Sequence, residues 1–158
     1  VGEDSGYPAI TVRQVGKGWA AYIAGQVFRA YQVKNQWNLK HVVANLLNLL
    51  IPERLVEVQA SAWLEVALMR QPASVERARE RVLVHLINHH RNRPIDRNNY
   101  CLEQVLPVRD VHVRVRHPRR PDRVTLEPGD RRAEWTYADG IVDVHVPEVQ
   151  IHTAIVMR

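Results

Sequence analysis

The sequence has one cysteine in 158 residues, Cys101, and this scarcity excludes several kinds of small protein. A lone thiol can form neither an internal disulfide framework nor a cysteine-based zinc cluster, and no local motif marks Cys101 as a nucleophile. An unpaired thiol is compatible with a reducing compartment. We therefore predict a cytoplasmic protein.

Long apolar runs are also missing. The longest candidate, Val42 to Ile51, is interrupted by Asn45 and Asn48 and falls short of the ~20 residues that span a bilayer. The opening VGEDSGYP does not begin with Met, and it has neither the basic nor the apolar stretch of a signal peptide. These features predict no membrane partner and a chain whose true N-terminus is absent.

Lysine is scarce, although the net charge is +5: of 22 basic residues, only Lys17, Lys34 and Lys40 are lysines, and the others are arginines. Such a charge raises the possibility of nucleic-acid binding. The arginines alternate with acidic residues, however, and no nucleic-acid-binding motif accompanies them. We predict no nucleic-acid partner, and a standalone basic regulatory or nucleic-acid-binding protein remains an alternative that only the charge favours.

The first third of the chain has the pattern of a hairpin followed by a helix. AITVRQV (residues 9–15) and WAAYIA (residues 19–24) read as strands around the turn Gly16-Lys17-Gly18. The second strand is apolar on both faces, which is typical of an inner strand covered by helices. An incomplete αβ unit is therefore expected here, with more of its sheet upstream.

One amphipathic helix is predicted after this hairpin. Asn35 or Asn38 is a candidate N-cap, and Pro52 ends the helix because proline cannot donate the next backbone hydrogen bond. The helix has apolar residues at spacings of three and four, namely Leu39, Val42, Val43, Leu46, Leu47 and Leu50.

After Pro52 the hydrophobic period changes from that of a helix to two, the period of strands. About seven short strands without helices predict an antiparallel β-sandwich over residues 54–158. Turn residues separate the apolar runs, and Ala138-Asp139-Gly140 between Trp135 and Ile141 is a strong hairpin signal. Two polar segments, 73–79 and 91–99, interrupt the strands as loops of unassigned role.

No catalytic or metal constellation stands out. A zinc site needs three or four converging ligands, whereas strand alternation places His85 and His89 on one face and His90 on the other. The remaining candidates, His112, His117, His145 and His152, are scattered. The 17 acidic residues show no pair placed for glycoside hydrolysis, and no serine lies in a GxSxG motif. We predict no catalytic residue, metal or cofactor.

Aromatic residues are few, and two of them share one strand face. Trp135 and Tyr137 are two residues apart and can form a platform on which a sugar ring stacks. The same pair can equally fill the interior of a sandwich. They are the carbohydrate-contact candidates of this sequence, and a carbohydrate-binding β-sandwich module is the alternative function that they favour.

Two groups of motifs resemble known hydrolase domains. SGYPAITVRQVGKGWAAYIAG (residues 5–25) and HVVANLLNLL (residues 41–50) resemble the end of the β-galactosidase trimerisation domain. VEV (56–58), LEVALMRQ (64–71), VLVHLIN (82–88) and VLPVRDVHVRV (105–115) resemble the C-terminal sandwich that follows it. The pattern is similar to that of large bacterial α-L-fucosidase-like or β-galactosidase-like glycoside hydrolases with an N-terminal TIM barrel.

The resemblance implies two domains in an α+β fragment followed by an all-β region. Residues 1–53 would be the end of a flavodoxin-like, glutamine-amidotransferase-like trimerisation domain, and residues 54–158 a C-terminal accessory β-sandwich. Catalytic residues of such hydrolases lie on barrel strands, and none can be carried over to this chain. The implied role is a non-catalytic structural and oligomerisation region, whose partners are the missing TIM barrel, the rest of the αβ domain and further copies of the full-length protein.

Overall fold

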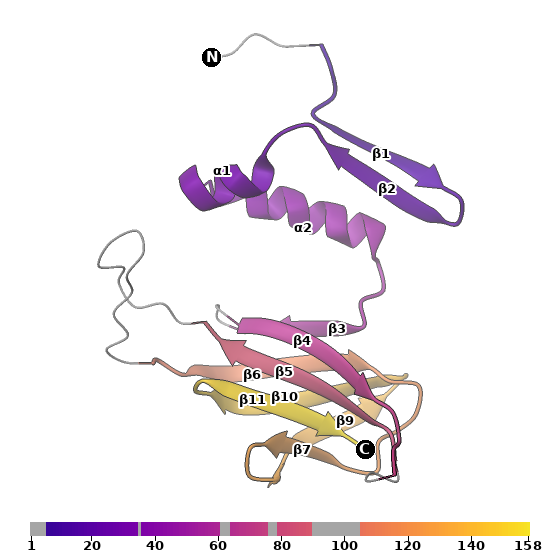
Figure 1. The fold of residues 1–158 in the computed structure, drawn as a ribbon, viewed down its shortest axis with the longest axis vertical. Helices are drawn as coiled ribbons and strands as arrows, with labels where there is room; N and C mark the ends of the chain where they lie inside the picture. The colour runs from indigo at the N-terminus through magenta and orange to yellow at the C-terminus, as the bar shows by residue number, and fades with distance from the viewer. Residues whose placement is uncertain (1–5, 35, 61–63, 76–78, 90–104) are drawn as a thin grey trace. The chain divides into compact units, whose positions relative to one another are not determined.

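The computed structural model describes residues 6–34, 36–60, 64–75, 79–89 and 105–158. The chain divides into two compact units, Val1–Arg54 and Leu55–Arg158, called the N-terminal unit and the C-terminal unit below. Figure 1 shows the elements of both.

The N-terminal unit begins with the predicted hairpin. Strands β1 (Ile10–Val15) and β2 (Gly18–Ile23) pair antiparallel, with Val15 opposite Gly18. Gly16 adopts a φ of +59° in the two-residue connection, a backbone conformation that glycine reaches without a steric penalty. The hairpin prediction is confirmed.

Two helices follow the hairpin, α1 (Val27–Lys34) and α2 (Asn38–Leu50), where the sequence analysis predicts one. Only Val27 and Ala30 of α1 are partly buried, so this short helix has little apolar periodicity to reveal it. Helix α2 ends before Pro52, as predicted. No helix in the described part of the chain is long and apolar enough to cross a membrane.

The prediction that Asn38 is the N-cap of α2 is wrong, and the other candidate, Asn35, lies outside the described residues. Asn38 is the first helical residue, Trp37 occupies the N-cap position, and no side chain caps the helix. Backbone carbonyls replace the side-chain cap, because Leu39 N–H donates to Gln36 O and Lys40 N–H donates to Trp37 O, both over 3.1 Å. These i to i+3 bonds form a tight first turn.

No described side chain of the N-terminal unit is fully buried. Helix α2 contacts β2 and α1, yet its apolar stripe is only partly covered, and Leu47 remains 44% exposed. On β2, Trp19 and Tyr22 are 54% and 67% exposed. These elements thus form regular structure around very little core of their own.

The C-terminal unit contains two antiparallel sheets. The four-stranded sheet has the order β3-β6-β10-β9, and the five-stranded sheet has the order β4-β5-β11-β7-β8. The nine strands are β3 (Val56–Gln59), β4 (Leu64–Gln71), β5 (Arg81–Asn88), β6 (Val108–Arg116), β7 (Val124–Glu127), β8 (Arg131–Arg132), β9 (Glu134–Ala138), β10 (Ile141–Val149) and β11 (His152–Met157).

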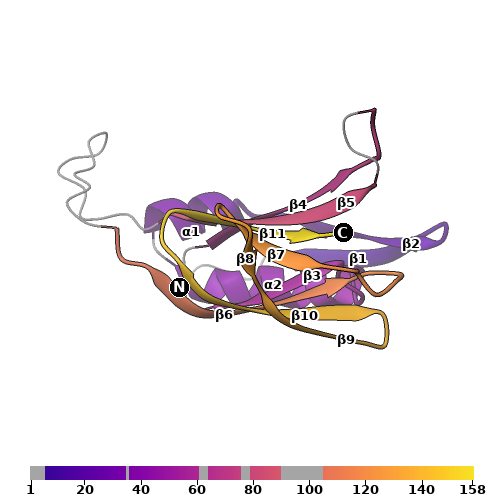
Figure 2. The ribbon, with the colours of Figure 1, turned by 90° about the horizontal axis from the view of Figure 1, so that it is seen from below.

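One hydrophobic core joins the two sheets, which form two layers in Figure 2. Alternate residues of the central strands point into it, and each of the following is fully inaccessible to solvent: Val84, Leu86, Val111, Val113, Val142, Val144, Val146, Val149 and Ile155. On β6 and β10 the opposite face carries His, Arg, Asp and Glu, so the period of two predicts correctly which side of these strands is buried. Strand β11 differs, because its residues from Thr153 to Met157 are buried on both faces. The predicted antiparallel β-structure after Pro52 is confirmed.

The C-terminal unit also contains the predicted hairpin between β9 and β10, in which Ile141 pairs with Ala138. Asp139 and Gly140 have φ angles of +52° and +75°, and positive φ at both central positions is the requirement of a type I′ turn. The described part of this unit has nine strands, two more than the predicted seven or so. One of them, the two-residue β8, is too short to leave a periodic pattern.

Candidate functional site

The two predicted carbohydrate-contact residues lie side by side on the edge strand β9. Trp135 and Tyr137 are partly buried and pack against the core of the C-terminal unit. The Tyr137 hydroxyl donates to the carbonyl of His117 at 3.3 Å, and the Arg120 guanidinium lies 5.5 Å from the centre of the Trp135 ring. Both side chains remain partly accessible, and Arg120 is placed for a cation–π interaction with one face of the Trp135 ring. The pair remains a prediction for carbohydrate contact.

Histidines gather on the outer faces of both sheets, as strand alternation predicts. On the five-stranded sheet, His85 Nδ1 lies 3.0 Å from His152 Nε2, and His89 contacts Glu65 at 2.6 Å. Among the described residues, no group of three or more His, Cys, Asp or Glu side chains is placed to hold a metal ion. A closed structural zinc site of four ligands is therefore absent from this part of the chain.

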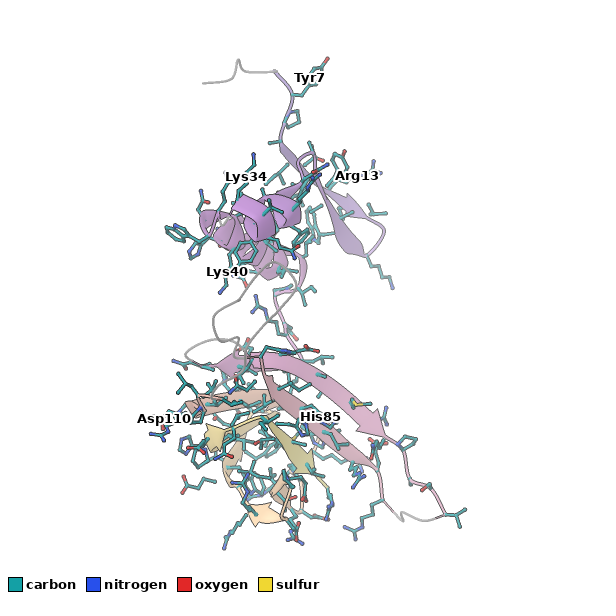
Figure 3. All side chains as sticks on the ribbon, turned by 60° about the vertical axis from the view of Figure 1, so that its left-hand side comes forward. Tyr7, Arg13, Lys34, Lys40, His85 and Asp110 are labelled. Carbon is teal, nitrogen blue, oxygen red and sulfur yellow. The ribbon has the colours of Figure 1, made fainter. Side chains whose placement is uncertain are left out.

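A second pair of histidines lies on the four-stranded sheet. His112 and His145 are cross-strand neighbours with ring centroids 5.0 Å apart. His145 Nε2 lies 3.5 Å from an Asp110 oxygen, and its Nδ1 lies 3.3 Å from a Glu134 oxygen. A neutral imidazole has one N–H, so only the protonated ring can donate to both carboxylates. Figure 3 labels one residue near each histidine pair. Asp110 is on β6 of the four-stranded sheet, and His85 is on β5 of the five-stranded sheet.

Carboxylates on the strands are engaged by basic side chains. Arg114 lies between Glu57 and Asp143, at 3.4 and 3.9 Å, on three adjacent strands. Arg109 lies 3.3 Å from Glu148. Such half-exposed pairs contribute little to stability, but each one neutralises a carboxylate. This arrangement differs from that of a glycosidase, where two carboxyl groups face each other across a cleft.

A cavity of about 520 Å³ opens on the N-terminal unit beside α1 and the turn before α2. Arg29 and Lys34 contribute the charge of its lining, and its described residues include no carboxylate and no histidine; Lys34 is labelled in Figure 3. General acid–base catalysis requires a titratable group within hydrogen-bonding reach of the substrate. Among the residues that the structure describes, none of those that line this cavity is an Asp, Glu or His.

Arg70 and Glu80 form a bidentate ion pair, with Nε to Oε1 at 2.8 Å and Nη2 to Oε2 at 2.7 Å. The hydrogen bond with Arg70 lowers the pKa of the Glu80 carboxyl, and the same bond raises the pKa of the Arg70 guanidinium. A glycosidase general acid needs a raised carboxyl pKa. Glu80 is shifted in the opposite direction and serves to connect residues flanking the β4–β5 turn.

The Glu80 pair predicts a small acid-dependent loss of stability. Because the folded-state pKa is lowered, the stabilisation is fully present above the unfolded value of ~4.3 and is lost as the pH falls through the folded value. Glu80→Gln is expected to make the Tm of the chain fall less steeply between about pH 6 and pH 3. Arg70→Gln removes the partner and should flatten the profile equally. Tm profiles of both variants parallel to that of the unchanged chain would contradict this.

Several residues singled out in the sequence lie outside the described residues. They are Cys101, His90, the loop at 91–99 and part of the loop at 73–79. The contact between His85 and His152 is not predictable from the sequence pattern. Both histidines lie on the outer face of the five-stranded sheet, and their proximity depends on the pairing of β5 with β11, which hydrophobic periodicity alone does not specify.

The chain is similar to part of a solved glycoside hydrolase. No protein-family model and no curated protein matches the sequence. Among solved structures, the chain is similar to alpha-L-fucosidase isoenzyme 2 from Paenibacillus thiaminolyticus, with a TM-score of 0.73 and 27% sequence identity. The similarity covers 99% of this chain but 22% of the fucosidase chain. Over nearly its whole length, the chain therefore resembles one region of a glycoside hydrolase.

Proposed function

We propose that this chain is a non-catalytic accessory region of a glycoside hydrolase of the α-L-fucosidase type. The observation that carries the proposal is the similarity over 99% of this chain to only 22% of a fucosidase chain. Most of the chain of such an enzyme would therefore lie outside this region, elsewhere in the full-length polypeptide. The ion-paired carboxylates of the strands agree with a role that is not catalytic.

The two units have different roles in this proposal. The C-terminal unit is an accessory β-sandwich, which its two sheets and shared core support. The N-terminal unit is the end of an αβ domain of the trimerisation type, which contributes to oligomerisation of the full-length protein. The support for this role is its exposed apolar surface, since helices and hairpins without buried side chains need further elements to cover them.

The test compares the 158-residue chain with the product of the whole reading frame in which it occurs. The chain alone is expected to release no 4-nitrophenol from 4-nitrophenyl α-L-fucoside above a blank. The full product is expected to hydrolyse it, because its barrel strands would supply the two carboxyl groups. A reading frame without a (β/α)₈ pattern would contradict the proposal. So would turnover by the chain alone that a single Asp or Glu substitution abolishes.

A further inference from the structure

The imidazoles of His85 and His152 present ring nitrogens to each other on the outer face of the five-stranded sheet. Their planes differ by 14°, and the ring centroids lie 5.2 Å apart, whereas Nδ1 of His85 and Nε2 of His152 are 3.0 Å apart. Because the nitrogens are much closer than the centroids, each ring directs a nitrogen-bearing edge toward the other. One nitrogen donates and the other accepts, so the pair shares one proton in this contact.

Strand pairing leaves space for both rings to turn. The direct cross-strand neighbours of His85 are Ala67 on β4 and Ala154 on β11, and alanine side chains offer little obstruction. Val84 and Leu86 on either side of His85 point into the core and fix the backbone of β5. His152 is exposed at the start of β11. The two imidazoles are therefore held close together by rigid strands while their rings remain accessible to solvent.

The spacing of the two nitrogens matches that of two imidazole ligands on one metal ion. With metal–nitrogen bonds of about 2.05 Å, two ligand nitrogens are about 2.9 Å apart at a right angle and about 3.3 Å apart at the tetrahedral angle. The observed 3.0 Å lies between these values. We propose that His85 Nδ1 and His152 Nε2 bind one Zn²⁺ ion, or another late first-row divalent ion that prefers imidazole, on the surface of the C-terminal unit.

Binding requires both facing nitrogens to offer lone pairs. The proton that the pair shares moves to the outward nitrogen of its own ring or to solvent, and each ring turns so that both lone pairs converge on the ion. No third His, Cys, Asp or Glu of the described residues completes the ligand set, so water occupies the remaining positions. The site is consequently open and reversible, unlike the closed four-ligand site of a structural zinc domain.

The pair on the other sheet is a matched control. His112 and His145 also lie on adjacent strands with their rings 5.0 Å apart. The two nitrogens of His145, however, face Asp110 and Glu134 on opposite edges of its ring. That arrangement directs both ring nitrogens of His145 toward carboxylates and away from a common point with His112, so the two imidazoles do not form the same chelate.

The test is isothermal titration of the 158-residue chain with Zn²⁺ at neutral pH. Once one imidazole has bound the ion, the second meets it at a high effective concentration. The resulting gain in Zn²⁺ affinity is lost when either imidazole is removed. His85→Ala and His152→Ala are each expected to weaken the tightest Zn²⁺ binding by at least about tenfold, and the double variant should weaken it no further. His112→Ala/His145→Ala is expected to leave it unchanged, and Mg²⁺, which prefers oxygen ligands, should not bind there.

Thermal unfolding gives a second measurement. Zn²⁺ is expected to raise the Tm of the unchanged chain and of His112→Ala/His145→Ala, because an ion that binds only the folded state stabilises it. Zn²⁺ should not raise the Tm of His85→Gln. Glutamine is close to histidine in size, so this variant is expected to keep the fold. Equal Zn²⁺ affinity in the His85 and control variants would overturn the proposal. Additive losses in the two single variants would overturn it as well, because they would indicate independent sites.

Discussion

Replacement of Ile155 by alanine is expected to lower the free energy of unfolding of the C-terminal unit by about 2–5 kcal/mol. Ile155 is on the central strand β11, is fully inaccessible to solvent, and belongs to the core shared by both sheets. Truncation removes buried apolar surface and leaves a cavity that rigid flanking strands cannot fill. Denaturant titration followed by the far-ultraviolet circular dichroism of the strands measures the effect.

Ile151 supplies a matched control for this substitution. It is the same residue type four positions earlier, and it is 66% exposed just before β11 begins. Ile151→Ala is expected to change the free energy of unfolding by no more than about 0.5 kcal/mol, as exposed substitutions usually do. Similar losses for both variants would show that β11 is not the centre of the core.

The buried face of β6 is predictable because strand geometry imposes a period of two. Val111, Val113 and Val115 alternate with polar residues in the sequence, and all three are buried in the structure. No long-range information is needed for this, since alternation follows from the backbone of each strand by itself. The type I′ turn at Asp139-Gly140 is predictable for a similar local reason, because few residues tolerate positive φ.

The order of strands and the contacts that depend on it are not encoded locally. Strand β3 pairs with β6, and β5 pairs with β11, across long stretches of sequence. His85 and His152 are 67 residues apart, yet their ring nitrogens are 3.0 Å apart. Periodicity places each histidine on an outer face but cannot select its neighbour, because many strand orders satisfy the same alternation.

Helix α1 shows a second limit of local patterns. Its sequence VFRAYQVK contains β-branched and aromatic residues that have lower helix propensity than alanine or leucine, and none of its residues is buried. Helix α2 is predictable because its leucines and valines recur at spacings of three and four. Short helices with weak stripes depend on tertiary context, which the sequence of a single segment does not contain.

The amides of residues 10–51 are expected to exchange with solvent at least about a hundredfold faster than those of β5, β10 and β11 when the 158-residue chain is studied alone. No described side chain of the N-terminal unit is fully buried. Full burial of an aliphatic side chain stabilises by roughly 1.5–3 kcal/mol, whereas fixing the backbone of each residue costs about 1–2 kcal/mol. A stripe that is only partly covered cannot offset that cost.

Hydrogen exchange of residues 1–158 and of residues 55–158 tests this expectation, together with size-exclusion chromatography. The strands of the C-terminal unit supply their own partners, so β5, β10 and β11 should be equally protected in both chains. The longer chain should also associate more, because Trp19, Phe28, Trp37 and Leu49 are more than half exposed in it. A monomeric longer chain whose α2 amides exchange as slowly as those of β11 would contradict the prediction. That outcome would mean that the N-terminal unit is stable without further elements, and the proposal that it is the end of a larger αβ domain would then fail.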